Sequence, residues 1–104
     1  RKVRAMSNTN INNMVGPIMR QGVLAKAVFE AAEIDNPDRT ILLEDRVAYL
    51  RIQTEDEMIL RQDTIQEMLG KPFKLNQLEV HLASFAGRIE THSDYVRFYF
   101  KDHL

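Results

Sequence analysis

Imidazole and carboxylate side chains are the groups in this chain that could bind a metal ion, and their spacing argues against such a site. One residue separates Glu79 from His81 and Glu90 from His92, and His103 has no second histidine one helical turn away. A helix brings two ligands to one face at i and i+3, so a carboxylate–imidazole pair needs two intervening residues. The 104-residue chain also lacks cysteine, which excludes thiolate zinc sites, iron–sulfur clusters and a cysteine nucleophile. We therefore expect no metal and no cofactor.

Hydroxyl and carboxyl groups beside His92 raise the alternative of a small hydrolase. Ser93 and Asp94 follow His92 directly, but three neighbours in one turn rarely reach the geometry of a catalytic triad. The triplet Glu44-Asp45-Arg46 could act as an acid–base pair, although such a triplet more often forms a turn with an ion pair. No glycine-rich phosphate loop and no nucleophile elbow occurs in the sequence. The pattern indicates a protein that is not an enzyme.

The charge balance does not favour nucleic acid as a partner. The net charge is −1, and residues 1–5, interpreted as a cloning remnant before a natural start at Met6, carry three of the 14 basic side chains. The remainder has 11 basic against 15 acidic side chains, the opposite of a nucleic-acid footprint. Val96-Arg97-Phe98 echoes the end of an RNA-binding aromatic strand, but Phe98 shares the parity of Val96 and reads as core.

The length of the chain predicts a single domain. Residues 1–14 are polar and rich in asparagine, so we expect a flexible N-terminal tail, followed by one compact domain over residues 15–101. No apolar run approaches the ~20 residues of a membrane span, and no signal-peptide core follows the basic start. The absence of cysteine fits a reducing compartment. We expect no membrane association and a cytoplasmic location.

The first half of the chain predicts a strand, a helix and three further strands. Residues 15–20 read as a strand, and because Pro17 cannot donate a ladder hydrogen bond, we expect this strand to lie at a sheet edge or to begin there. Apolar residues at helical spacing predict a helix over residues 23–34, with Ile34 on its buried side. The segments expected to be extended are residues 40–44, 47–53 and 58–60.

The second half predicts two helices and a closing hairpin. Asp63 is a candidate cap for a helix that ends before Gly70. Asn76 and Glu79 form a second capping box, and Leu75 can staple onto Val80, which predicts a helix running to about Ser84. Residues 85–91 and 95–101 alternate as a hairpin, with Val96, Phe98 and Phe100 on its apolar face. The order of strand, helix, strands, helix, helix and hairpin defines an α+β domain with helices packed on a mixed or antiparallel sheet.

The segment Leu82-Ala83-Ser84-Phe85-Ala86-Gly87 is harder to explain by folding alone. Small residues surround one aromatic side chain, which permits a close backbone approach to the same chain or to a partner. From spacing, Phe85 is equally compatible with the core and with a contact surface. The residues therefore indicate a small, acidic α+β binding module.

Several of these pieces occur together in one family. The chain resembles the effector, or coupling, proteins of bacterial multicomponent diiron monooxygenases, and within them the toluene (or xylene) monooxygenase effector. The resemblance spans about residues 13–101, and its carriers are Val15-Gly16-Pro17, Glu33-Ile34-Asp35-Asn36-Pro37, Glu44-Asp45-Arg46 with Ala48-Tyr49, Leu69-Gly70 with Pro72-Phe73, Leu82 to Gly87, and Arg97-Phe98-Tyr99-Phe100.

The resemblance implies a function that composition could not reveal. Family members have no cofactor and no activity of their own. They dock on the diiron hydroxylase above its active-site helices, change the geometry of that site, improve coupling and tune regiospecificity. They share the docking surface with a Rieske ferredoxin, and the free effector is expected to be a monomer. Partner-binding residues carried over from the resemblance are His81, Ala83, Ser84, Phe85 and Gly87. An unrelated protein-interaction adaptor of the same fold is the alternative.

Overall fold

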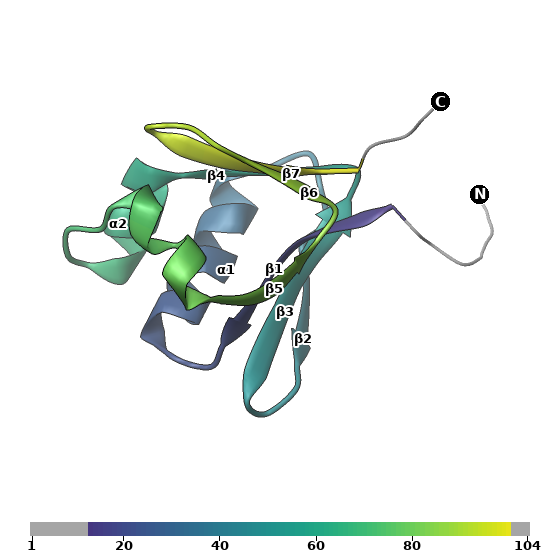
Figure 1. Ribbon diagram of the computed structural model, residues 1–104, viewed down its shortest axis with the longest axis horizontal. Helices are drawn as coiled ribbons and strands as arrows, with labels where there is room; N and C mark the ends of the chain where they lie inside the picture. Colours follow the sequence, from purple (N-terminus) through teal and green to yellow (C-terminus); the bar gives the residue numbers. More distant parts are fainter. Residues whose placement is uncertain (1–12, 101–104) are drawn as a thin grey trace.

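Two antiparallel sheets pack with two α-helices in the computed structural model, which describes residues 13–100 (Figure 1). The larger sheet has the strand order β2-β3-β1-β5 and the smaller one β4-β7-β6. In chain order the elements are β1 Met14–Arg20, α1 Val23–Asp35, β2 Leu42–Asp45, β3 Tyr49–Glu55, β4 Glu57–Arg61, α2 Gln62–Leu69, the 3-10 turns η1 Leu75–Gln77 and η2 Glu79–His81, β5 Leu82–Ala86, β6 Arg88–Thr91 and β7 Tyr95–Tyr99. This arrangement confirms the predicted α+β class.

The N-terminal boundary of the domain differs by one residue from the prediction. Met14 already pairs with Glu55 of β3, so the ordered domain begins before residue 15. Residues 1–12 and 101–104 lie outside the described residues. The predicted flexible tail therefore remains a prediction, as does the end of the domain at Lys101.

Strand β1 lies inside the larger sheet, so the expectation that Pro17 marks a sheet edge is wrong. Pro17 is fully buried and is paired with Phe85 of β5. On the other side, the pairing of β1 with β3 includes Met14, Val15 and Ile18 to Arg20 but skips Gly16 and Pro17. The missing N–H of proline therefore falls at a gap in the ladder, where no strand hydrogen bond is lost.

Gly16 allows β1 and β3 to approach closely at this gap. Its φ is 138°, and a Cβ added to it would lie 2.1 Å from the carbonyl oxygen of Ile52. Any other residue would push the two strands apart. The Val15-Gly16-Pro17 motif is thus explained by the packing of the sheet.

The smaller sheet contains a closing hairpin of β6 and β7, as predicted, but the strand predicted over residues 85–91 is divided at Gly87: Phe85 and Ala86 pair with β1 in the larger sheet, and only Arg88–Thr91 pair with β7. β7 is its central strand, and Val96 and Phe98 are buried opposite Leu60 and Met58 of β4. Phe100 was expected on the same buried face, but it follows the end of β7 and is exposed. The alternating pattern of β7 places a residue on the buried face only while the strand continues, and β7 ends at Tyr99, before Phe100.

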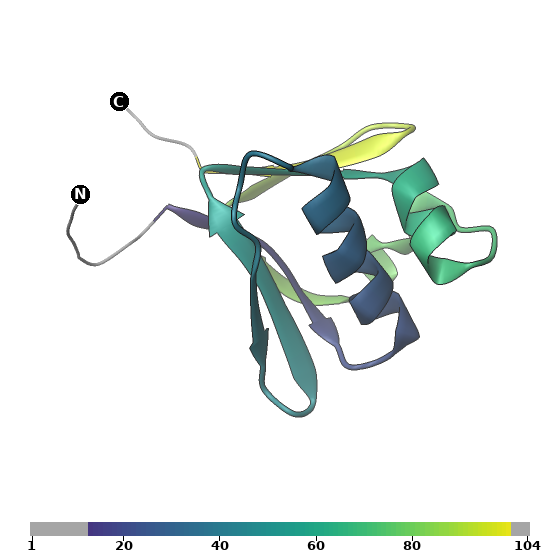
Figure 2. The same cartoon turned by 180° about the vertical axis from the view of Figure 1, so that it is seen from behind.

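Helix α1 packs through small side chains. Figure 2 shows the helix from behind the molecule, in front of the strands. Its buried residues are Ala25, Ala27, Val28, Ala31 and Ala32, and it contacts both α2 and β4. Ile34, predicted on the buried side, is exposed because it lies in the last turn, outside this alanine-rich stripe. The small side chains allow the helix to lie close to its neighbours.

Asp35, the last residue of α1, stabilises the start of α2. Asp35 accepts hydrogen bonds from the Arg61 backbone N–H at 2.8 Å and from the Thr64 hydroxyl at 2.8 Å. The predicted cap Asp63 instead lies in the first turn, and α2 begins at Gln62 with no side-chain cap of its own. The carboxylate of Asp35, which is distant in sequence, therefore takes the capping role predicted for Asp63. The predicted helix end at Gly70 is confirmed by its left-handed φ of 82°.

The predicted helix from Asn76 to Ser84 does not form. Two short 3-10 turns replace its beginning, and its end becomes β5, which pairs with β1. Leu75 and Leu78 are both buried, as the i, i+3 geometry of a 3-10 turn allows, whereas Val80 is exposed. Pairing with β1 prevails over the local capping signals, because it satisfies the β5 backbone and completes the sheet.

Strand β2 is the outer strand of the larger sheet and contains no buried residue. It pairs with β3 from Leu42 to Asp45. In the connecting turn, Val47 has a φ of 68° and a side chain that is 86% exposed. The Asp45 carboxylate accepts a hydrogen bond from the Val47 N–H at 2.8 Å, which holds this turn in place.

Candidate partner-binding surface

Strand β5 brings the predicted contact residues to one edge of the larger sheet. It pairs with β1 on one side, and within residues 13–100 no strand pairs with its other side. Ala83, Ser84 and Phe85 are all exposed, and His81 precedes them, also exposed, at the end of η2. An open edge presents unpaired N–H and C=O groups together with these side chains. The structure therefore places four of the five predicted residues on one continuous segment of the surface.

Phe85 combines a packing contact with exposure. Its ring centroid lies 6.0 Å from that of the buried Phe98, with the planes tilted by 55°. At the same time 40% of the residue is exposed. The aromatic side chain is thus held by the core on one side and available to a partner on the other.

Gly87 differs from the other predicted contact residues. Its φ is 88°, and an added Cβ would lie 2.6 Å from Val15 Cγ1 and 2.8 Å from the Tyr99 carbonyl oxygen. The residue lies where the chain leaves β5 in the larger sheet and enters β6 in the smaller one. Its glycine is required by the fold, whatever a partner does there.

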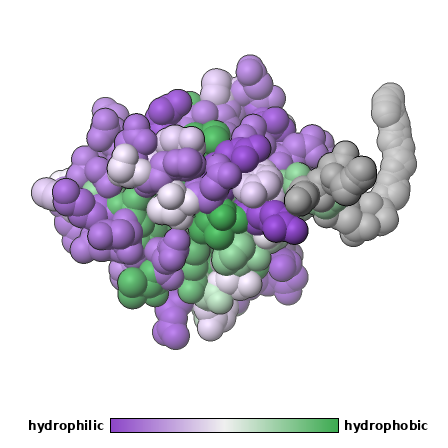
Figure 3. Space-filling model, turned by 45° about the horizontal axis from the view of Figure 1, so that its top comes forward, coloured by the Kyte–Doolittle hydropathy of each residue, from purple (hydrophilic) through white to green (hydrophobic). Residues whose placement is uncertain are grey.

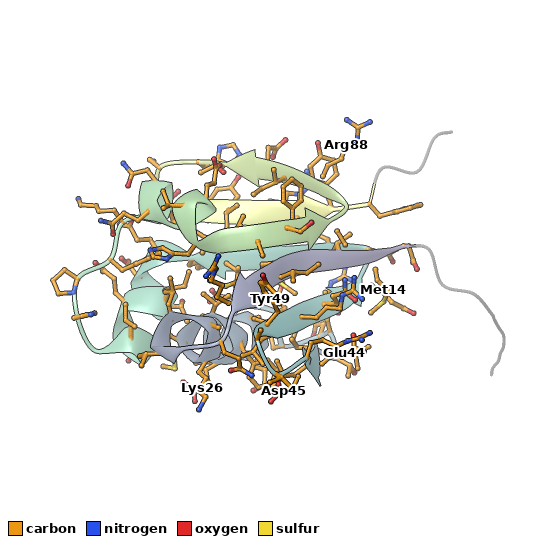
Figure 4. All side chains as sticks on the ribbon, turned by 60° about the horizontal axis from the view of Figure 1, so that its bottom comes forward. Met14, Lys26, Glu44, Asp45, Tyr49 and Arg88 are labelled. Carbon is orange, nitrogen blue, oxygen red and sulfur yellow. The ribbon has the colours of Figure 1, made fainter. Side chains whose placement is uncertain are left out.

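Two grooves flank the segment that leads into β5. One, of about 640 Å³, lies between the end of β1, the start of α1, Tyr49 and the residues from Val80 to Ala83. The other, of about 600 Å³, lies between the start of α1 and the end of α2. Figure 4 labels Tyr49 beside β1, with Glu44 and Asp45 on the neighbouring hairpin. Both grooves have Val23, Leu24, Val80 and His81 in their walls.

Val23 and Val80 are the residues of this surface that sequence reasoning missed. The sequence predicts Val80 in a hydrophobic staple, within a helix that does not form. It predicts Val23 only as the first residue of a helix, with no surface role. Figure 3 shows apolar groups collected across the middle and lower part of one face, within a hydrophilic surround. The sequence contains no local signal that separates these valines from core residues.

The alternative catalytic site around His92 does not assemble. His92 Nε2 lies 3.2 Å from a carboxylate oxygen of Glu90, and its ring stacks on Tyr95 with centroids 4.4 Å apart. Among the described residues, no group of three or more His, Cys, Asp or Glu side chains could hold a metal ion. The ion pair expected within residues 44–46 is confirmed, because Arg46 lies 3.0 Å from Glu44, but Glu44 and Asp45 belong to strand β2 and not to the turn that follows it.

Arg97 lies on the outward face of the smaller sheet. It forms an ion pair with Glu57, lies 3.6 Å from Glu90, and its guanidinium is 4.1 Å from the centre of the Tyr99 ring. The hydrogen bond to Glu57 is the main cause that raises the pKa of Arg97. Phe98, the aromatic residue of the segment that echoes an RNA-binding strand, is buried on the opposite face and so is not available to stack on a base.

An α+β domain that presents an open strand edge beside two grooves with exposed valines has the features of a protein-binding module. The chain belongs to the MmoB/DmpM family, whose pattern matches residues 13–99. It is 36% identical over 100 residues to the effector subunit of the alkene monooxygenase system of Xanthobacter autotrophicus, a match that covers 92% of this chain and 99% of that protein.

Solved structures of low sequence identity share the fold. A chain of a phenol hydroxylase–regulatory protein complex superimposes with a TM-score of 0.72 at 22% identity, covering 84% of this chain and 98% of that one. The soluble methane monooxygenase regulatory protein B gives a TM-score of 0.67 at 21% identity, covering 88% of this chain and 68% of that one. The predicted resemblance to monooxygenase effector proteins is confirmed at the level of the family, and the chain is a non-catalytic, effector-type component of a monooxygenase system. The toluene or xylene branch stays a prediction. Neither α-helix of the described residues has the length and apolar character needed to cross a membrane.

Proposed function

We propose that this protein is a cofactor-free effector subunit that binds a diiron hydroxylase and tunes its active-site geometry, its coupling and its regiospecificity. The observation that carries the proposal is the open edge of β5, where Ala83, Ser84 and Phe85 are exposed next to His81. A strand edge held rigidly by β1 offers a partner both backbone groups and side chains in a fixed geometry. Gly87 contributes by holding the end of that strand in place.

The physical mechanism is a shift in the populations of the hydroxylase. An effector favours an active geometry only to the extent that it binds that geometry better than the resting one. A hundredfold preference corresponds to about 2.7 kcal/mol of differential binding free energy. A partly exposed aromatic residue such as Phe85, if covered only in the active complex, is of the type that provides energies on this scale.

The proposal extends to the other components of the system. The free protein is a cytoplasmic monomer, and it occupies a hydroxylase surface that it shares with a Rieske ferredoxin. Excess effector then excludes the electron donor. The shared surface follows from the family resemblance, and the chain needs no metal or cofactor of its own for this role.

The substrate of the hydroxylase has two candidates. The resemblance to the toluene and xylene branch favours an aromatic hydrocarbon. The 36% identity to an effector subunit of an alkene monooxygenase system favours an alkene as the second candidate. Assays with toluene and with a short alkene, using the same hydroxylase and effector, distinguish the two.

Titration of the effector into the reconstituted system tests the proposal. Hydroxylation by the hydroxylase, ferredoxin and reductase of the same monooxygenase system should rise with effector up to stoichiometric amounts and then fall. Coupling of reductant consumption to product should rise in parallel, because the effector favours the productive geometry. A monotonic plateau far above stoichiometry would refute the shared surface. No effect on rate, coupling or product distribution would refute the effector role and leave the unrelated adaptor.

A further inference from the structure

Val23 and Val80 form an apolar ridge between the two grooves. Val23 is 72% exposed and Val80 is 79% exposed, and both side chains line each groove. Single exposed valines are common on protein surfaces and need no explanation. Val23 and Val80 come from segments far apart in the sequence but line the same two grooves, and together they form the apolar ridge. Neither belongs to the buried core.

Folding gives no reason for valine at either position. Val23 opens α1 outside its buried alanine stripe, where a polar residue would serve the helix as well. Val80 lies in η2, whose residues are all outside the buried set. Apolar side chains that stabilise nothing within the chain are typical of a surface that a partner covers.

The charges around the ridge have one sign. Arg20 lines the first groove and Lys71 the second, and no carboxylate lines either, although the chain has 15 acidic residues. Glu79, the sequence neighbour of Val80, instead accepts a hydrogen bond from the Thr91 hydroxyl at 2.9 Å. Neither cation is engaged in an ion pair within residues 13–100. The surface therefore complements an apolar patch bordered by acidic side chains.

We propose that the ridge of Val23 and Val80 is a second contact with the hydroxylase and inserts into an apolar depression bordered by carboxylates. This inference rests on the proposed function. The partner is the same one because the first groove is lined by Leu82 and Ala83 as well as by the two valines, so the ridge and the β5 edge form one continuous surface. Docking on β5 thereby brings the ridge against the same molecule.

Binding of the purified hydroxylase by polar variants of the ridge tests this inference. Val23→Asn and Val80→Asn remove the exposed apolar groups without disturbing the core, so the melting temperature should stay close to wild type. The double variant should bind about tenfold more weakly or worse, because an apolar contact is lost at the interface. Ile34→Asn is the matched control: it removes another exposed apolar side chain from α1, at a position that lines neither groove, and should bind as wild type.

The acidic border is tested through salt. Arg20→Glu and Lys71→Glu should weaken binding most at low ionic strength and reduce the salt dependence of the affinity. Wild-type affinity in the double asparagine variant would overturn the ridge, and an unchanged salt dependence in both charge reversals would overturn the acidic border. If Phe85→Ala weakens binding while the ridge variants do not, this inference alone fails. If the wild-type protein does not bind the hydroxylase, the proposed function fails and this inference with it.

Discussion

The side chain of Asn36 occupies both backbone hydrogen-bonding groups of Ile59. Its Nδ2 donates to the Ile59 carbonyl oxygen at 2.8 Å, and its Oδ1 accepts from the Ile59 N–H at 2.9 Å. Asn36 thus takes the place of a neighbouring strand along the outer edge of β4. Asp35 continues the same edge by accepting from the Arg61 N–H. The protein thus covers the edge of β4 with side chains, whereas β5, like β2 and β6, lies at the end of its sheet with one side not paired to another strand of the described residues.

Replacing Asn36 with alanine should destabilise the fold. The change removes both bonds to Ile59 and a third bond to the Ala32 carbonyl oxygen, so we expect a loss of about 2–3 kcal/mol in the free energy of unfolding. Urea unfolding of the variant measures this loss. Asn13→Ala is the control, since it removes an exposed amide that bonds Asp56, and it should cost less than about 0.5 kcal/mol. Equal stabilities of the two variants would contradict the edge-closing role.

Gly87→Ala should be more damaging than Gly70→Ala. Both glycines have a left-handed φ, 88° and 82°, which alone costs a side chain about 1–3 kcal/mol. An added Cβ at Gly70 meets nothing within 4 Å, whereas at Gly87 it meets Val15 and Tyr99. We expect a further loss of about 2 kcal/mol at Gly87 from overpacking. Thermal unfolding of the pair measures the difference. Equal losses of stability in the two variants would contradict the structural requirement for glycine at position 87 and would leave partner contact as its only proposed role.

Phe85→Ala should affect both folding and binding. Loss of the contact with Phe98 should cost about 1 kcal/mol of stability, since a ring pair contributes on that scale beyond area burial. Loss of the exposed part should weaken hydroxylase binding by about 2 kcal/mol if the ring is a hot spot. Unfolding and binding measured on one preparation separate the two effects.

Ser84→Ala tests the same segment without changing its packing. Ser84 is exposed, so stability should stay within about 0.5 kcal/mol of wild type. We expect altered coupling or product distribution with the hydroxylase. If Ser84→Ala leaves binding, coupling and regiospecificity unchanged and Phe85→Ala only lowers the melting temperature, the partner-binding site lies elsewhere.

Deletion of residues 1–10 should leave the fold and most of the coupling intact. The described fold starts with Asn13, which bonds Asp56, and with Met14, which pairs with Glu55. The removed residues show no apolar periodicity. Circular dichroism and coupling assays at saturating effector measure the outcome. A loss of activity beyond about tenfold, equivalent to 1.4 kcal/mol, would show that these residues take part in the function.

The elements that sequence reasoning predicted correctly are those with a strong period of their own. Helix α1 and the β6–β7 hairpin follow from regular apolar spacing. The helix predicted from Asn76 failed because its capping signals are local, whereas the pairing of β5 with β1 depends on residues more than 60 positions away. The wrongly predicted helix also led to a wrong position for Val80, which was expected in a hydrophobic staple. Val80 is exposed because η2 replaces that helix. The contact residues predicted on β5 come from family resemblance, since their small side chains have no period to detect, and their role stays a prediction.

All four residues of strand β2 are exposed, and this lowers the local stability expected for the strand. Because it buries no side chain and pairs with β3 alone, its opening forfeits hydrogen bonds but little apolar contact. Its amide protons should therefore exchange with solvent well before those of β1, which is paired on both sides. Strand β2 is then a low-stability element attached to β3, whose Leu50 and Ile52 belong to the buried core. In engineering terms, the turn at Val47 is the position where foreign sequence can be inserted while β5 keeps its shape.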